Sequence, residues 1–169
     1  MIYIGIDPGI DGAIAASSKY GQRVTVMPII VGTTGGTKST LDINAIVRWL
    51  KTALQDVLPN ANEEVLVGLE KVSAMPKQGI TSAFNFGQTY GMLKGIVVTL
   101  GYPLELVRPQ AWKKIILEGT LKDKSAAIQY VKQRYPNLNL KATERCRVDH
   151  DGIADAVCIA AYLERTHGK

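Results

Sequence analysis

The chain has 169 residues, 46% of them hydrophobic and 21% charged, and its formal net charge is +5. No linker or low-complexity stretch divides it, so we expect a single domain over residues 1–169 with a real core. The sequence shows no secretory leader, no apolar run long enough to span a membrane and no cysteine pattern of a disulfide framework. We therefore expect a soluble, cytoplasmic protein with no membrane partner, in which Cys158 is a core thiol.

The first three predicted strands form an antiparallel meander. Residues 1–6 ("MIYIGI") are followed by strands at 12–17 ("GAIAAS") and 23–30 ("RVTVMPII"), with a tight turn between the last two. Residues 31–40 ("VGTTGGTKST") are rich in glycine and threonine and have no strand or helix period, which predicts a loop.

The rest of the chain alternates helices with strands. Asp42 can cap a helix over 43–57, which Pro59 ends, and the apolar run at 64–70 ("EVLVGLE") is typical of a buried parallel strand. The later elements are a helix from Thr81 or Ser82 to Leu100, a strand at 103–107, a helix from Pro109 through Trp112, a helix at 122–135 and a last helix that begins between Asp149 and Asp151. This order predicts a mixed α/β sheet with helices on its faces.

Positive charge is concentrated in one segment. From Arg108 to Arg147 there are ten basic and three acidic residues, which gives +7 there and −2 for the rest of the chain. Such a block indicates a polyanion partner, most simply nucleic acid, although a solvated helical face is the alternative interpretation. Trp112, beside Lys113 and Lys114, could contact DNA or be partly buried.

Four carboxylates fall at the ends of predicted elements. Asp7 and Glu70 end the first and fourth strands, and Asp151 and Asp155 share one face of the last helix. If the two strands are neighbours, all four converge, and converging carboxylates need a cation such as Mg²⁺ or Mn²⁺. Two ions roughly 3.5 to 4 Å apart can activate a water and stabilise the leaving oxygen of a phosphodiester. Read alone, Asp155 could instead be a charge favoured by the helix dipole.

The residues after Asp7 predict a tight turn. Pro8, Gly9 and Gly12 follow it at once. Because glycine has no Cβ, we expect Gly9 and Gly12 to let a phosphate backbone approach closely.

Six stretches carry a family resemblance. They are "IGIDPG" at 4–9, "LE" at 69–70, "SAFNFGQTYGMLKGIV" at 82–97, "VRPQAWKKIIL" at 107–117, "DKSAAIQYV" at 123–131 and "DHDGIADAVCIAAY" at 149–162. In this order they resemble the RuvC-type Holliday junction resolvases, in particular their bacteriophage branch. The resemblance implies a ribonuclease H-like fold with a mixed five-stranded sheet flanked by helices, a homodimer and two Mg²⁺ or Mn²⁺ ions per active site. It also implies paired nicks across a four-way DNA junction, in the cytoplasm of a bacterium or a phage-infected host.

The resemblance assigns the catalytic and metal-binding acids to Asp7, Glu70, Asp151 and Asp155. Bacterial members space the two helical acids three apart, which would put the third acid at Gly152. Asp149 and His150 remain alternatives to Asp151.

The resemblance also implies basic DNA contacts at Lys113 or Lys114 and at Lys124, and we expect Lys124 to be catalytic as well. The family's aromatic wedge falls on Ser73, so Met75 is the nearest apolar substitute. The expected DNA-binding set is Gly9, Gly12, Met75, Lys77, Lys113, Lys114, Lys122 and Lys124.

These patterns predict a metal-dependent, structure-selective DNA endonuclease that acts on four-way junctions and other branched DNA. The alternatives are another ribonuclease H-like nuclease, cutting RNA in hybrids or flaps, and a junction-binding protein without cleavage. For the homodimer we expect the long helix to form the interface, through Phe86, Tyr90, Leu93 and Val97 at helical spacing, with Gly91 allowing close approach.

Overall fold

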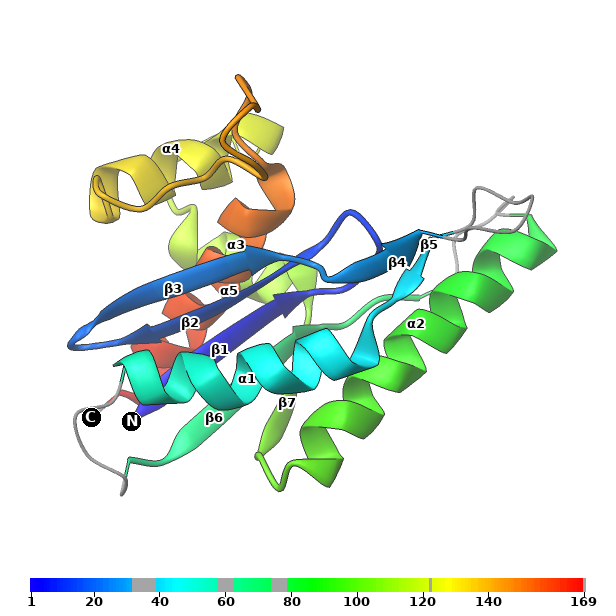
Figure 1. Cartoon of the computed structure of the whole chain (residues 1–169). Coiled ribbons are helices and arrows are strands. Elements are labelled where there is room, and N and C mark those ends of the chain that lie inside the picture. Colours follow the sequence, from blue (N-terminus) through cyan, green and yellow to red (C-terminus); the bar gives the residue numbers. More distant parts are fainter. Residues whose placement is uncertain (32–38, 58–62, 74–78, 122, 169) are drawn as a thin grey trace.

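The computed structural model describes residues 1–31, 39–57, 63–73, 79–121 and 123–168 (Figure 1). Five strands form the main sheet in the order β3-β2-β1-β6-β7. Their bounds are β1 Ile2–Asp7, β2 Ala13–Ser18, β3 Gly21–Val26, β6 Val65–Glu70 and β7 Leu104–Val107. β1, β2 and β3 pair antiparallel, whereas β6 pairs parallel with β1 and with β7. The mixed five-stranded sheet predicted from the sequence is confirmed.

The strand predicted over residues 23–30 is two strands in the structure. β3 ends at Val26, and β4 (Ile29–Val31) pairs antiparallel with β5 (Ser39–Leu41) in a separate two-stranded sheet. Pro28 explains the break, because it has no backbone N–H to continue the ladder. The loop predicted over 31–40 therefore has strand residues at both of its ends, and residues 32–38 lie outside the described residues.

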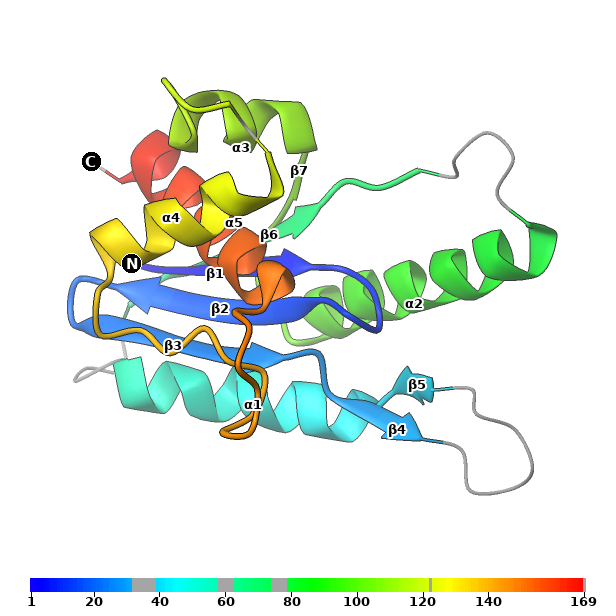
Figure 2. The ribbon, with the colours of Figure 1, turned by 90° about the horizontal axis from the view of Figure 1, so that it is seen from above.

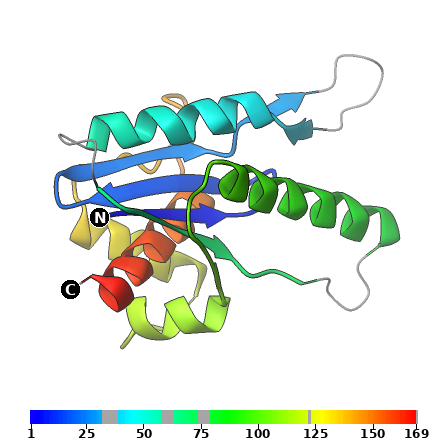
Figure 3. The ribbon, with the colours of Figure 1, turned by 90° about the horizontal axis from the view of Figure 1, so that it is seen from below.

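Helices cover both faces of the main sheet. α1 (Ile43–Val57) and α2 (Ile80–Thr99) pack on one face, and α3 (Pro109–Ile116), α4 (Lys124–Arg134) and α5 (Asp151–His167) pack on the other (Figure 3). As predicted, the residue before α1 caps it: the Asp42 carboxylate accepts a hydrogen bond from the Ala45 N–H at 2.9 Å. No helix in the described ranges is both long and apolar enough to cross a membrane.

Side chains alternate along β1 between the two faces of the sheet. Ile2, Ile4 and Ile6 are fully buried against α1 and α2, whereas the positions between them face α5. Gly5 lies on the α5 face, where a Cβ would be 2.0 Å from the backbone oxygen of Ala156. α5 therefore packs directly on β1, and it also buries Cys158 in the core, as predicted.

The predicted dimer contact on α2 is wrong for Leu93 and Val97. Leu93 and Val97 are buried in the core between α2 and the sheet, and Tyr90 packs against the same cluster. This helical stripe therefore serves the chain's own fold. The outward face of α2 carries Phe84, which is 71% exposed, and Gly91, where a Cβ would meet nothing within 4 Å.

Candidate active site

Two carboxylates lie at the ends of neighbouring parallel strands. The register pairs Ile6 with Leu69, so the next positions, Asp7 and Glu70, are adjacent at the carboxyl ends of β1 and β6. Leu69 packs toward α1 and α2, and the alternation of the strand then places Glu70 on the α5 face, as it does Asp7. The first and fourth predicted strands are therefore neighbours, which is the condition under which the sequence predicts that Asp7 and Glu70 meet.

The first turns of α5 bring two more carboxylates to this edge. Asp151 and Asp155 are four residues apart on this helix, and Gly152 beside them is buried. A Cβ on Gly152 would lie 2.8 Å from the Asp11 backbone oxygen and 3.0 Å from Asp7 Oδ2. The helix therefore needs glycine at this position to come so close, and an acid at 152 does not fit this structure.

The four carboxylates interact electrostatically. Burial, followed by the charges of Glu70, Asp155 and Asp151, raises the pKa of Asp7 to about 8, and Lys113 opposes this shift. Burial also raises the pKa of Asp155 to about 6; Lys113 again opposes the shift, and Glu70 and Asp151 add to it. Burial, together with the neighbouring like charges, thus makes the ionised forms of Asp7 and Asp155 costly.

The donor chemistry suits a hard divalent cation, because the site consists of carboxylate oxygens whose mutual repulsion a cation would relieve. The ligands are not gathered, however: in the part of the chain that the structure describes, no three His, Cys, Asp or Glu side chains form a group that could hold a metal ion. Asp151 Oδ1 instead accepts a hydrogen bond from the Gly152 N–H at 3.0 Å. Since Asp151 is exposed, its side chain can turn toward Asp7 without repacking the core.

Glu70 accepts a hydrogen bond from α3. Trp112 is completely buried, and its indole Nε1–H donates to Glu70 Oε1 at 2.9 Å. Lys113 Nζ lies 5.1 Å from the centre of the same indole ring, within range of a cation–π interaction. Of the two interpretations of Trp112, burial is therefore the correct one, although its one polar group reaches the candidate site.

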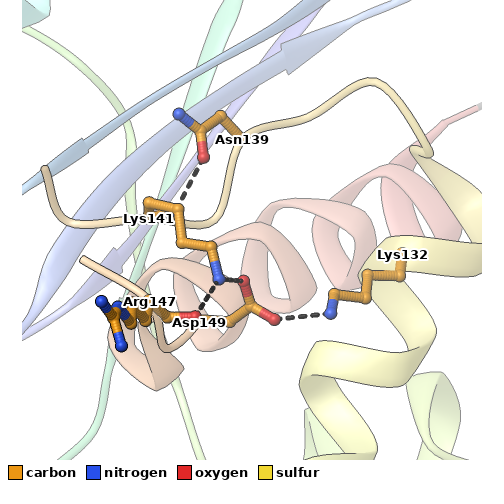
Figure 4. Close-up of polar contacts among 5 residues, drawn as sticks. All are labelled: Lys132, Asn139, Lys141, Arg147 and Asp149. Atoms are coloured by element: carbon orange, nitrogen blue, oxygen red, sulfur yellow. Dashed lines mark hydrogen bonds and ion pairs between the residues drawn. The ribbon is translucent and has the colours of Figure 1, made fainter. Parts of the chain in front are cut away.

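Asp149 and His150 have other partners. Asp149 forms ion pairs with Lys132 at 2.5 Å and Lys141 at 2.8 Å, and hydrogen bonds from these lysines hold the pKa of Asp149 below its usual range (Figure 4). Lys141 also donates to the backbone oxygen of Arg147 at 2.7 Å, so this network ties the segment before α5 to α4. His150 is the N-cap of α5, and its Nδ1 accepts from a backbone N–H of the first turn at 3.2 Å. These contacts favour Asp151 over both alternatives.

A cleft of about 940 Å³ opens beside the acids. Its lining runs from Asp7, Asp151 and Asp155 across residues 8–12 to β5 and the N-terminal half of α2. Figure 2 shows β4, β5 and this end of α2 extending beyond the main sheet on the same side. A strand of a polymeric substrate could therefore lie along the cleft with one linkage at the acids.

Both glycines of the predicted turn line this cleft. Gly9 has a φ of +126°, which favours glycine. A Cβ on Gly12 would lie 2.1 Å from the Asp7 backbone oxygen, so the turn itself requires glycine here. The tight turn is confirmed, and the expected phosphate contact stays a prediction.

The structure describes the side chains of only some of the predicted DNA contacts. Lys113 acts on the pKa values of Asp7 and Asp155, and Lys114 is exposed on α3. Lys124 is the first residue of α4, but its side chain is outside the part that the structure describes, so its catalytic role stays a prediction. Three further predicted DNA contacts lie outside the described residues: Met75, Lys77 and Lys122.

No protein-family model and no curated protein matches the chain. Solved structures match it over almost its whole length. RuvC of Thermus thermophilus in complex with a Holliday junction substrate aligns with a TM-score of 0.56 at 18% identity, over 98% of this chain and 96% of that one. The chain has the fold of RuvC.

Two further structures agree with the RuvC fold. Another Thermus thermophilus RuvC structure has a TM-score of 0.50 at 19% identity, over 98% of this chain and 96% of that one. The yeast mitochondrial Holliday junction resolvase has a TM-score of 0.53 at 14% identity, over 96% of this chain and 77% of that one. The ribonuclease H-like fold implied by the resemblance is confirmed, whereas the bacteriophage branch stays a prediction.

The sequence reasoning missed two residues that shape this RuvC-fold site. The sequence does contain a signal for the contact between Trp112 and Glu70: Pro109 fixes the start of a helix, and this puts Trp112 about one turn beyond a strand end. The sequence contains no signal for the role of Gly152, because glycine is required there only by how near α5 comes to Asp7 and Asp11.

Proposed function

We propose that the protein is a metal-dependent, structure-selective DNA endonuclease that resolves four-way junctions, and other branched DNA, by paired nicks. The observation that carries this proposal is that Asp7, Glu70, Asp151 and Asp155 interact electrostatically at one edge of the sheet, in a chain with the RuvC fold. The neighbouring structures support the substrate class, because one contains a Holliday junction substrate and another is a Holliday junction resolvase. We further propose that it acts in the cytoplasm and belongs with the bacteriophage members.

In this proposal the four acids hold two Mg²⁺ or Mn²⁺ ions. Bound there, the ions would supply Lewis-acid stabilisation of a phosphodiester oxygen and an activated water. Asp7 supplies a ligand on a rigid strand end, and its raised pKa means that the metal-free site keeps a proton on this carboxyl near neutral pH. Metal binding must displace that proton, so the affinity for the metal should rise with pH up to about 8.

The remaining residues position the DNA. Lys113 brings positive charge to the acids, where it can neutralise a scissile phosphate, and the exposed Lys114 can contact the backbone nearby. Gly9 and Gly12 line the cleft and have no side chains of their own, which supports close approach of a strand at these two positions. Lys124 completes the basic set as a proposed catalytic residue.

Paired nicks need two active sites related by a twofold axis, so we propose a homodimer. The outward face of α2 is the proposed contact, because the exposed apolar side chains of Ile80, Phe84 and Val98 lie on the same helix as Gly87 and Gly91, where an added Cβ would meet nothing within 4 Å. We propose this face in place of the sequence-predicted contact, because Leu93 and Val97 of that contact are buried in the core.

The test compares cleavage of four-way, three-way and linear duplex DNA, an RNA–DNA hybrid and a flap, each with Mg²⁺ and with EDTA. The proposal expects metal-dependent cutting that is fastest on the four-way junction, with nicks placed symmetrically on two opposed strands. Preferred cutting of the hybrid or the flap would support another ribonuclease H-like nuclease. Tight junction binding without cutting in any divalent metal would support a junction-binding protein.

A further inference from the structure

The starting observation is a polar contact made by a fully buried side chain. Trp112 is 0% exposed, and an indole N–H in such a place needs an acceptor, since a buried polar group without a partner costs stability. The acceptor is Glu70 Oε1 at 2.9 Å, although 42 residues separate the two in the chain. The contact therefore depends on the fold, and it joins the core to a candidate metal ligand.

The backbone around this contact holds donor and acceptor in fixed places. Glu70 pairs in register with Val107, and the Lys71 N–H donates to the Val107 backbone oxygen at 2.7 Å, immediately beyond the ladder. Pro109 then starts α3, so that Trp112 lies one turn into a helix anchored to the neighbouring strand. The backbone of neither residue can shift without breaking main-chain hydrogen bonds.

The bond leaves Glu70 able to bind a cation. A carboxylate has about four lone-pair positions, and the indole N–H uses one of them on Oε1. Outer-shell donors of this kind fix the orientation of a ligand, and their loss typically weakens metal binding 10- to 100-fold. The face of the same ring also supports Lys113, whose charge acts on Asp7 and Asp155.

We propose that Trp112 is a positioning residue, whose indole N–H fixes the Glu70 carboxylate for metal binding. The inference rests on the proposed function, because it assumes that Glu70 binds the ion. A purely structural role depends on the apolar ring, and phenylalanine keeps an apolar aromatic ring, although a smaller one, without the N–H. The N–H is the part of the side chain that the inference concerns.

The test uses Mn²⁺ and three proteins: wild type, Trp112→Phe and, as a matched control, Trp49→Phe. Trp49 is the second tryptophan of the chain and packs with the core cluster on the opposite face of the sheet. We expect the dissociation constant for Mn²⁺, measured by the electron-spin signal of the free ion, to rise 10- to 100-fold in Trp112→Phe and to stay unchanged in Trp49→Phe. Junction affinity in EDTA should be equal in all three, and the Mn²⁺ concentration for half-maximal cleavage should rise by the same factor only in Trp112→Phe.

A measurement on Trp49→Phe keeps the inference testable even if Trp112→Phe folds poorly. In that protein Trp112 is the only tryptophan, so saturating Mn²⁺, a paramagnetic quencher, should reduce its fluorescence, and EDTA should restore it. Unchanged Trp112 emission at saturating Mn²⁺ would place the ion away from Glu70, which would overturn the inference together with the assignment of Glu70 as a metal ligand. Equal Mn²⁺ affinity in wild type and Trp112→Phe, while both cut junctions, would overturn the inference alone. If wild type neither binds Mn²⁺ nor cuts, the proposed function fails and the inference fails with it.

Discussion

Replacing Asp7 by asparagine should stabilise the metal-free protein while it abolishes cleavage. In the folded state the pKa of Asp7 is about 8, so the carboxyl keeps its proton up to about that pH, whereas in the unfolded chain it loses the proton near its ordinary pKa of 3.8. A raised folded pKa means that stability is greatest at low pH and falls as pH rises from about 4 to about 8. At about 1.4 kcal/mol per pH unit, the loss by pH 7 is about 4 kcal/mol. The asparagine side chain carries no charge at any of these pH values, so the variant should avoid this loss.

The assay is urea unfolding of wild type and Asp7→Asn in EDTA at pH 6, 7 and 8. Between pH 6 and 8 the free energy of unfolding of the wild type should fall by about 2 kcal/mol through Asp7. It should fall much less in the variant, because Asp155, the other acid with a raised pKa, has a pKa of only about 6 and is largely ionised above that pH. Added Mg²⁺ should raise the unfolding midpoint of the wild type and not of the variant. Asp149→Asn is the control: this carboxylate has a lowered pKa and two lysine partners, so its loss should destabilise the protein with no added pH dependence in this range. Parallel stability curves for wild type and Asp7→Asn from pH 6 to 8 would refute the reasoning.

Three further predictions concern Lys113, Gly152 and Gly91. Lys113→Met should slow cleavage at saturating junction more than it weakens junction binding, because the Lys113 charge acts on the acids. Single-turnover kinetics measure the cleavage rate and a binding titration measures the affinity. An equal loss of rate and affinity would make Lys113 a simple contact to the DNA backbone. Gly152→Ala should destabilise the protein by roughly 1 to 3 kcal/mol, since its Cβ would meet the Asp11 backbone oxygen at 2.8 Å; an unchanged urea midpoint would contradict the close packing of α5. Gly91→Leu should leave the monomer at least as stable, because leucine favours a helix by roughly 1 kcal/mol over glycine, but it should convert dimers to monomers in sedimentation. Lys51→Leu, at an exposed position of α1, is the control, and an unaffected dimer in Gly91→Leu would exclude this face of α2.

The sheet could be predicted because its strands carry strong local patterns. Two strands are indicated by apolar runs, one before Asp7 and one before Glu70, and the turn between β2 and β3 indicates an antiparallel pair. The order of these elements favours a mixed sheet. The two-stranded sheet was missed since β5 is only three residues long and follows a glycine- and threonine-rich stretch. Its pairing with β4 is a tertiary contact that no local period reveals.

The candidate site was predictable in its acids and unpredictable in its supporting contacts. Asp7 and Glu70 stand out as carboxylates at the ends of apolar strands, and the spacing of Asp151 and Asp155 indicates a shared helix face. The fold adds support for the choice of Asp151 over Asp149 that the sequence could not supply, because only tertiary structure brings Lys132 and Lys141 to Asp149 (Figure 4).

The apolar spacing along α2 misled the dimer prediction for a related physical reason. A helical stripe such as Leu93 and Val97 has the same period whether it faces the chain's own sheet or a second copy. The structure resolves this ambiguity by burying both side chains, and it leaves Phe84 and Gly91 on the outward face.

The central claim is that the four acids catalyse metal-dependent cutting of branched DNA. The most direct measurement is cleavage of a four-way junction in Mg²⁺ by purified wild type and by Asp7→Asn, with junction binding measured on the same preparations. The account predicts paired nicks by the wild type, no cutting by the variant, and junction affinity in the variant that is equal or higher, because a negative charge near the phosphates is lost. Metal-dependent cutting by Asp7→Asn at a rate close to that of the wild type would contradict it.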